Sequence, residues 1–425
     1  MRFFWEKNKV RFLLFMAVLG PGLITAMADN DAAGVATYSV AASLYGMSSQ
    51  YFVVLTTILL AVTQEIGARI AIVTGKGLGD LIRENYGLRV AVVLFLAYFT
   101  ANQSVILQNV TGLKSAIQLF NLPGWIGWMH WQGLLVLVCL GLILAVVFLN
   151  YKNLQRIFLV TILFYATYIV SALMAKPDWG QALKHSLIMP QKELMGDMHY
   201  WFTLIAVLGT TVTAWGQFFI NSFVADKGIK PEQLKEQRTE VFFGAILTNI
   251  FSWMIAIAVT YTLFVNRTVI TDAQTAALAI GPLAGNFSYI LFATGLLAAS
   301  LLGLIVVPLA TAYVFTELFG YERTLNASFG KGRVFYTFFI LQIVLGLVVA
   351  LFPSINLFGL TLYANYLNGA ILPVVFYFLI RFSENPEIMG QAYISRGFGK
   401  WFLRGSAFFI AIAVVTTFFG QFLLK

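Results

Sequence analysis

The stretch Ala28-Asp29-Asn30-Asp31-Ala32-Ala33-Gly34 lies near the middle of the first long apolar segment of this 425-residue sequence. An ionised aspartate at the centre of a membrane helix costs about 2.5–3.5 kcal/mol on insertion scales, and this segment carries two within three residues. Gly20-Pro21-Gly22 precedes the cluster and Gly34 closes it, so we expect the helix to break here. Membrane transporters build cation sites from such breaks, with free carbonyls beside carboxylates. A pair of acids salt-bridged to another span is the alternative, but few basic residues lie within the other spans.

The composition excludes an ordinary soluble domain. The chain is 60% hydrophobic and 11% charged, with a mean hydropathy of +0.83, which indicates an all-α polytopic membrane protein. The net charge of +9 comes from basic residues in short loops between apolar segments, so we expect the lipid bilayer as partner and no nucleic acid. A single Cys139 rules out a disulfide framework. Without a nucleotide-binding signature or a nucleophile–base pair, we expect neither ATP-driven transport nor an enzyme, and no cofactor beyond a transported ion.

Apolar windows of about 20 residues predict eleven spans in a single transmembrane domain over residues 1–425. The predicted spans are 12–45, 47–73, 88–119, 132–151, 154–175, 199–225, 239–265, 284–319, 334–352, 355–381 and 401–424. The first is too long for one span, which fits two half-helices on either side of the polar break.

Loop charge predicts the orientation of these spans. The N-terminal tail is basic, and so is every second loop, whereas the loops between them carry few Lys or Arg residues. Basic loops stay on the cytoplasmic side. We therefore expect a multi-pass cell-membrane protein with a cytoplasmic N-terminus and, because the number of spans is odd, a C-terminus outside.

A second broken span is predicted five spans after the first. The segment 199–225 contains AVLGTTVTAWGQFFINSFV, again with a Thr-rich polar stretch between glycines at mid-depth. Since five is odd, the two halves would have inverted topologies, and paired broken helices in inverted halves point to a transporter binding site. The predicted repeats are 12–175 and 199–381, with 401–424 as an accessory eleventh helix.

The candidate ligands are almost all oxygen atoms. The first break offers Asp31, Asp29, Asn30 and carbonyls around Ala28, and the second offers Thr213, Gln217 and carbonyls near Trp215. In the segment 355–381, Asn365 and Asn368 share one helix face, where they could contact substrate or bond to another helix. Hard oxygen ligands suit magnesium, calcium or manganese rather than zinc or copper. The small neighbours of these groups suit a partly hydrated Mg²⁺ ion, or simply close helix packing.

At these residues the chain resembles the Nramp family of divalent-metal transporters, which have a LeuT-like inverted-repeat fold. The resemblance covers the first ten spans and is strongest at GPGLITAMADNDAAG, ARIAIVTGKGLGDLIRENYG and LGTTVTAWGQ. The family motif Asp-Pro-Gly-Asn falls on residues 31–34, and Met-Pro-His-Asn falls on residues 213–216. Only Asp31 is retained, because the metal-binding Asn becomes Gly34 and the soft Met ligand becomes Thr213.

The two motifs look more like the Nramp-related magnesium transporter branch, which reads close to ADNDAGG and GTTITPWMQ. Ala33, Ala214 and Gly216 depart even from that pattern. The family's metal-assisting Gln in the tenth span falls on Asn365. The positions that carry protons in the wider family align with residues that do not titrate, so the resemblance implies a lost proton path: Ile106, Asn109, Trp215 and Ile220.

These observations predict a secondary transporter that takes up Mg²⁺, and also Mn²⁺, by alternating access without proton coupling, acting as a monomer. Asp31 is the predicted principal ligand, and Asp29 or Asn30 would act through water or indirectly. Other groups would complete or surround the ion: carbonyls of Ala28 and Ala214, the side chains of Thr213, Gln217 and Asn365, and nearby Gly34, Trp215, Gly216 and Asn368. The alternatives are a proton-coupled Mn²⁺/Fe²⁺ carrier and a LeuT-like carrier of an organic substrate.

Overall fold

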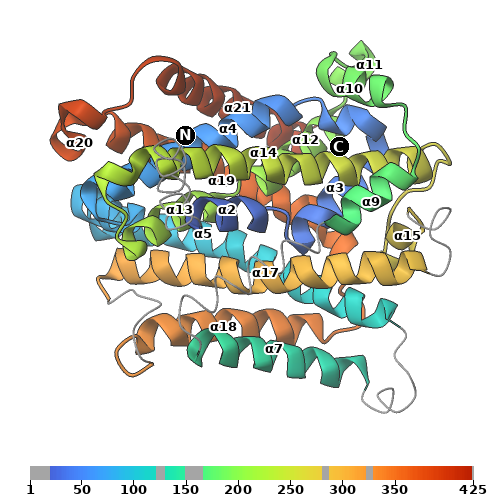
Figure 1. The fold of residues 1–425 in the computed structure, drawn as a ribbon, viewed down its shortest axis with the longest axis horizontal. Helices are drawn as coiled ribbons and strands as arrows, with labels where there is room; N and C mark the ends of the chain where they lie inside the picture. Colours follow the sequence, from blue (N-terminus) through green and yellow to red (C-terminus); the bar gives the residue numbers. More distant parts are fainter. Residues whose placement is uncertain (1–19, 121–129, 149–165, 280–286, 322–328, 424–425) are drawn as a thin grey trace, which may run out of the picture.

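The computed structural model describes residues 20–120, 130–148, 166–279, 287–321 and 329–423, and over these ranges the chain is helical without β-strands. Its longer helices follow the predicted spans closely (Figure 1). They are α2 (Pro21–Ala28), α3 (Ala32–Tyr45), α4 (Val53–Thr74), α5 (Leu78–Leu119), α7 (Trp131–Phe148), α9 (Ala166–Met174), α12 (Met198–Thr211), α13 (Ala214–Lys227), α14 (Leu234–Val259), α17 (Phe287–Phe319), α18 (Arg333–Ala350), α19 (Leu357–Ser383) and α21 (Gly397–Leu423).

Short helices connect these elements at the two ends of the bundle. They are η1 (Gly46–Gln50), α10 (Trp179–Leu187), α11 (Lys192–Met195), η2 (Pro231–Gln233), α15 (Ala273–Leu278) and α20 (Pro386–Tyr393), while η3 (Thr260–Phe264) continues α14 as a π-helical turn.

Nine helices in the described ranges are long and apolar enough to cross a membrane. This count takes Met198–Lys227, which includes the second break, as one crossing, whereas the predicted first span is described only from residue 20 and falls into α2 and α3, of 8 and 14 residues. Part of the predicted span 154–175 lies outside the described residues, which begin again at α9. The total of eleven spans therefore stays a prediction, whereas the polytopic helical architecture is confirmed.

Both predicted breaks are present, and each restarts with a capped helix. In the first break, Asp31 accepts a hydrogen bond from the amide of Gly34 at 3.0 Å and so caps α3. In the second break, Thr213 accepts one from the amide of Gly216 at 3.0 Å and caps α13. A side-chain acceptor at this position satisfies an otherwise unpaired helix amide. The sequence therefore encodes both restarts locally.

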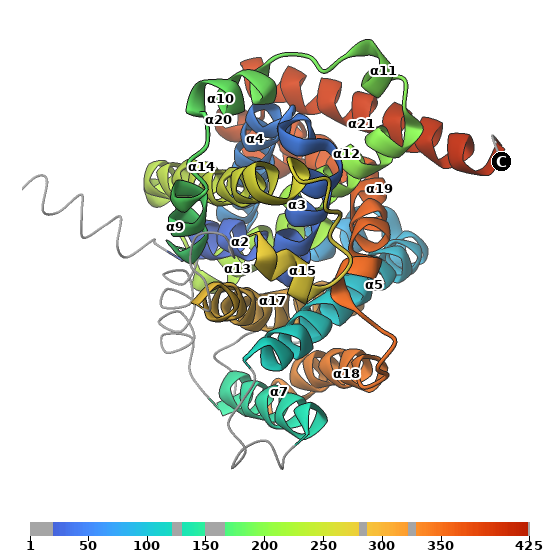
Figure 2. The same ribbon diagram turned by 90° about the vertical axis from the view of Figure 1, so that its right-hand side faces the viewer.

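The broken helices lie at the centre of the bundle, with α4 and α14 on one side and the long pair α5 and α17 on the other (Figures 1 and 2). Helices α7 and α18 pack outside α5 and α17, away from the breaks. Burial follows this arrangement: 94% of the apolar window in Met198–Lys227 is buried, against 22% in α7 and 17% in α21. The peripheral helices therefore face lipid, and the breaks are shielded from it.

The two ends of the bundle differ in charge. The ion pairs found among the described residues lie at the end that carries α20 and the α13–α14 connection, on the left in Figure 1. Examples are Arg238 with Glu65 at 2.7 Å and Arg404 with Glu384 at 2.5 Å. The opposite end carries α10, α11 and α15. This asymmetry agrees with the loop pattern in the sequence, and the cytoplasmic assignment of the basic end stays a prediction.

Candidate metal site

One hydrogen bond joins the two breaks directly. The hydroxyl of Thr213, at the start of α13, donates to Oδ1 of Asp29 at 2.7 Å. The same hydroxyl accepts from the amide of Gly216 at 3.0 Å, so its orientation is fixed from both sides. Asp29 and Thr213 are buried, with 2% and 3% of their surface exposed. The structure thus brings together predicted residues that are separated by 184 positions in the sequence.

Asp31 is held by the protein through both carboxylate oxygens. Oδ1 accepts from the amide of Gly34 at 3.0 Å, and Oδ2 accepts from the carboxamide of Asn109 at 2.6 Å. Its position at the N-terminus of α3 also favours the negative charge, because the helix dipole is positive there. Asp31 is therefore held in place by hydrogen bonds to both of its oxygens, with lone pairs left for a further partner.

Asn109 has a function in this structure that sequence reasoning missed. Besides its bond to Asp31, its Oδ1 accepts from the amide of Ala32 at 3.1 Å, so this α5 side chain binds the break twice. Gly303 on α17 makes the room, since a β-carbon there would overlap the Asn109 carboxamide. Family alignment marked Asn109 only as a lost proton position. The available signal was chemical: a carboxamide deep in an apolar helix requires a partner.

Asn30 points in a third direction, toward α14. Its amide donates to the carbonyl and to the hydroxyl of Thr248, both at 2.7 Å, and its oxygen accepts from Ser252 at 2.8 Å. All these partners lie on α14. Asn30 therefore anchors the break, and its predicted indirect contact with the ion remains untested.

Several polar atoms around the second break are buried without a hydrogen-bond partner in the described part of the chain. They are Oδ2 of Asp29, Nε1 of Trp215 and both polar atoms of Gln217 and Asn368. Gln217 follows Thr213 by one helical turn and so lies on the same face of α13. A buried carboxylate oxygen is costly to leave unpaired. A cation could pair with the acceptor oxygens in this set, Oδ2 of Asp29 and the carboxamide oxygen of Gln217, whereas the N–H groups of Trp215, Gln217 and Asn368 require acceptors such as water.

The structure shows which backbone carbonyls at the breaks are already used within helices and which are free. Ala28 ends α2, and its carbonyl already accepts from the amide of Asp31 at 3.1 Å. Ala214 is the first residue of α13, so its carbonyl points along that helix. The last turn of an α-helix leaves its carbonyls without intrahelical partners. In the second break the free carbonyls therefore belong to the end of α12, just before Thr213, rather than to Ala214.

Two glycines allow the close approach of the breaks. A β-carbon at Gly34 would lie 2.6 Å from the carbonyl oxygen of Asp29, so the asparagine of the wider family could not fit here without moving that residue. At Gly216, a β-carbon would lie 2.6 Å from the Thr213 hydroxyl and 3.2 Å from Asp29 Oδ1. A larger residue at either position would therefore displace Asp29 or the Thr213 hydroxyl bonded to it.

Asn365 is used differently from the prediction that it completes the ion site. Its amide donates to Thr37 at 2.7 Å, to the carbonyl of Thr361 at 3.1 Å and to Gln108 at 3.2 Å. These bonds join α19 to α3 and α5, which matches the interhelical alternative. Asn368, one turn further along, is fully buried without a partner among the described residues. A contact between either residue and an ion stays a prediction.

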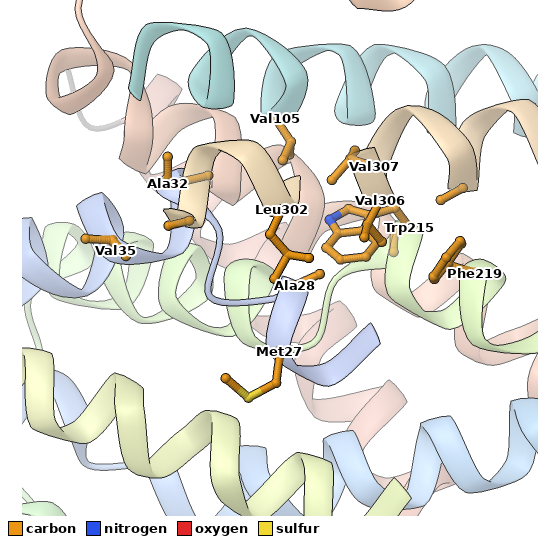
Figure 3. Close-up of a cluster of buried hydrophobic side chains, with 14 of the residues drawn as sticks. Met27, Ala28, Ala32, Val35, Val105, Trp215, Phe219, Leu302, Val306 and Val307 are labelled. Atoms are coloured by element: carbon orange, nitrogen blue, oxygen red, sulfur yellow. The ribbon is translucent and has the colours of Figure 1, made fainter. Parts of the chain in front are cut away.

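An apolar wall lines one side of the breaks. Figure 3 shows the Trp215 indole beside Leu302, Val306 and Val307 of α17, with Ala28 close by. Met27 points away from this wall. The Met27 sulfur therefore does not face Trp215, and the side chain that bonds to Asp29 is the hydroxyl of Thr213.

The positions that align with the proton path of the wider family hold packed side chains, and the loss of that path stays a prediction. Ile106 lies against Gly346 of α18, and Ile220 lies against Gly67 of α4. The three histidines, at positions 130, 185 and 199, are all exposed. No group of three or more His, Cys, Asp or Glu side chains able to hold a metal occurs among the described residues. A site here must therefore use the two aspartates with neutral ligands.

Comparisons with known proteins agree with this architecture. Residues 22–420 match the Nramp family, described as natural resistance-associated macrophage protein-like. The divalent metal cation transporter MntH of Mesorhizobium japonicum is 22% identical over 402 residues, which cover 91% of this chain and 85% of that protein. MntH of Latilactobacillus sakei is 21% identical over 425 residues, or 96% of this chain and 89% of the relative.

Solved structures show the same fold. The manganese transporter of Eremococcus coleocola superposes with a TM-score of 0.73 at 13% identity, covering 96% of this chain and 88% of its own. MhsT in complex with L-phenylalanine gives 0.58 at 16% identity, with coverage of 93% and 97%. The predicted LeuT-like fold with two broken helices is therefore confirmed. Because the family match spans nearly all of the sequence, this chain belongs to the Nramp family of multi-pass membrane transporters and is not an enzyme.

Proposed function

We propose that this protein is a secondary transporter of Mg²⁺, and also of Mn²⁺, that works by alternating access without proton coupling. One observation carries the proposal. Asp29 is buried where the two broken helices meet; Thr213 holds one of its carboxylate oxygens, and the other has no partner in the described chain. An anionic oxygen placed in this way is a ligand for a cation.

The chemistry of the donors supports a hard divalent ion. Two carboxylates, a hydroxyl, a carboxamide and helix-end carbonyls are the oxygen ligands that Mg²⁺ and Mn²⁺ accept. Mg²⁺ usually keeps several waters and is held by one or two carboxylates. The soft Met ligand of the wider family is replaced by Thr213 in this chain, and Met27 points away from the wall beside the break.

Within this proposal, Asp29 contacts the ion directly through Oδ2, together with Gln217. Asp31, which the sequence ranked first, already accepts one hydrogen bond on each oxygen. It contributes its charge and its remaining lone pairs, directly or through water. The carbonyl of Ala28 and those at the end of α12 complete the set, and the transporter acts as a monomer.

Membrane voltage alone can drive such uptake. Moving a divalent cation into a negative cell gains about 4.6 kcal/mol per 100 mV, twice the value for a single charge. That energy supports a gradient of about a thousandfold. Ile106, Asn109 and Ile220 stand at the positions of the family's proton path, and none of them titrates. Uptake driven by voltage does not need a titratable relay.

The competing function is proton-coupled transport of a transition metal. The Eremococcus coleocola structure is that of a manganese transporter, which favours the transition metal in this alternative. The two functions differ in the ion carried and in whether protons move with it, so one experiment separates them.

The test is uptake into proteoliposomes that contain both a Mg²⁺ reporter and a pH reporter. We expect voltage-driven Mg²⁺ entry without acidification, strongly reduced in Asp29→Asn and preserved in Asp178→Asn, which removes a carboxylate that caps the peripheral helix α10. Acidification that follows Mn²⁺ entry, with no response to Mg²⁺, would establish the proton-coupled alternative instead.

A further inference from the structure

A groove of about 400 Å³ lies between α4, α12 and α21, and its lining includes none of the residues proposed above to hold the ion. Its walls are largely apolar and include Leu55, Leu59, Leu204, Leu208, Trp401 and Phe409. At its inner end it reaches Tyr38 and Thr211, whose hydroxyls are hydrogen-bonded at 2.7 Å.

The surroundings of the groove favour a hydrocarbon chain as its occupant. The helices α4 and α21 that form its rim are both apolar enough to cross a membrane, and α21 runs obliquely along the outside of the bundle (Figure 2). Large apolar side chains remain exposed at the rim: Leu55 by 49%, Phe409 by 50% and Trp401 by 67%. A rim of this kind opens onto lipid tails rather than water.

The end of the groove at Trp401 carries excess positive charge. The Lys400 ammonium lies 5.8 Å and the Arg404 guanidinium 5.4 Å from the centre of the Trp401 ring. Both cations pair with the same carboxylate, Glu384, at 3.3 and 2.5 Å. Two cations facing one anion leave a net positive charge beside an interfacial aromatic residue, which is the chemistry that attracts anionic lipid headgroups.

We propose that this groove binds one anionic phospholipid, with its phosphate between Lys400 and Arg404 and one acyl chain between α4, α12 and α21. The chain would contact Leu204 and Leu208 of α12. That half-helix ends at Thr211, two residues before the Thr213 hydroxyl that holds Asp29. The bound lipid thus contacts the half-helix that leads to the second break.

The binding test uses thermal unfolding of the full chain in detergent, titrated with phosphatidylglycerol or phosphatidylcholine. Gly405 lines the groove, and a β-carbon there meets no atom within 4 Å, so Gly405→Phe should fill the groove without disturbing its walls. Ile412→Phe is its control, since Ile412 is 49% exposed on α21 and does not line the groove. The charge variant is Lys400→Gln with Arg404→Gln, and Lys76→Gln is its control at the same basic end.

We expect phosphatidylglycerol to raise the unfolding midpoint of the wild type more than phosphatidylcholine does. The charge variant should lose this difference, Gly405→Phe should lose the response to both lipids, and both controls should behave as the wild type. Native mass spectrometry should also find one retained phosphatidylglycerol in the wild type and none in Gly405→Phe, or in Ser406→Leu if Gly405→Phe does not fold. Equal stabilisation of the wild type by both lipids, or a lipid retained in the filled variants, would overturn the proposal. Neither readout involves metal transport, so this test is independent of the proposed function.

Discussion

The two breaks in the central helices have the same outline but are built differently. The first break is charged, and its three polar residues bond to three separate helices: Asp29 to α13, Asn30 to α14 and Asp31 to α5. The second break is uncharged, and its Thr213 hydroxyl bonds back to the first. The first break therefore supplies the charge of the site on a firmly held backbone, and the second completes the site with neutral groups.

The half-helices that precede the two breaks, α2 and α12, also differ in how their first amides are hydrogen-bonded. The start of α2 is buried against α14, where Glu240 accepts from the amides of Gly20 at 2.5 Å and Leu23 at 3.1 Å. The start of α12 is capped only by the neighbouring Asp197, which accepts from the amide of His199 at 2.8 Å near the surface. Helix α2 is thus bound to α14 at both ends, since Asn30, two residues after its last residue, also bonds to α14. We infer that α2 and α14 must separate, or move together, when access to the site changes.

The largest expected effect comes from removing the charge of the first break. Asp29→Asn keeps the size of the side chain but loses the anionic oxygen, so the rate of Mg²⁺ uptake should fall by about a hundredfold, in line with about 3 kcal/mol for removing one partner of a buried charge pair. Isothermal titration of Mg²⁺ should show a matching loss of affinity. Thr213→Ser, which retains the hydroxyl of the second break, should remain close to wild type. Equal losses of Mg²⁺ uptake in Asp29→Asn and Thr213→Ser would show that the charge of the first break matters no more than the side chain of the second.

A smaller loss is expected when the clamp on the first break is removed. Asn109→Leu leaves Asp31 Oδ2 and the amide of Ala32 without their partner, at a cost of about 2 kcal/mol, and uptake should fall by about thirtyfold. Asn102→Leu is the matched control, because Asn102 is equally buried on α5 but donates to Thr311 instead. The control should lower the unfolding midpoint without changing the affinity for Mg²⁺. If both variants lost only stability, Asn109 would have no role at the site.

The contrast between the breaks also separates what the sequence could predict from what it could not. Asp31 and Thr213 cap their own helices, three residues from the amides they bind, so both restarts follow from local pattern. The bonds of Asn30 to Thr248 and of Asn109 to Asp31 cross 218 and 78 residues. No periodicity encodes such partners, because they depend on how helices pack. For the same reason the sequence could not determine that Asp29, rather than Asp31, has the unpartnered oxygen.

The bond between the two breaks is the next test of the comparison. Thr213→Val has nearly the same shape but cannot donate to Asp29 Oδ1, a loss of about 1.5 kcal/mol for a hydrogen bond to a charged group. The apparent KM for Mg²⁺ should rise by about tenfold, while Thr213→Ser should restore it. Gly216→Ala should raise KM in the same direction, because its β-carbon would press on the same hydroxyl and on Asp29. An unchanged KM in Thr213→Val would mean that the second break does not position Asp29.

The smallest expected effect lies at the far end of α2. Glu240→Ala removes the acceptor for the first amides of this half-helix, at a cost of about 1 kcal/mol, so hydrogen exchange across Pro21–Ala28 should accelerate by about fivefold. Asp197→Ala makes the equivalent change at α12, but its cap is near the surface, where water can replace it, and exchange there should change by less than twofold. If α2 must leave α14 during transport, Glu240→Ala should also alter the rate of uptake without altering the affinity for Mg²⁺, because Glu240 binds the half-helix and not the ion. A change in the affinity for Mg²⁺ would instead indicate that Glu240 acts on the ion site. The start of α2 would then not be a separate anchor from the charged break at its other end.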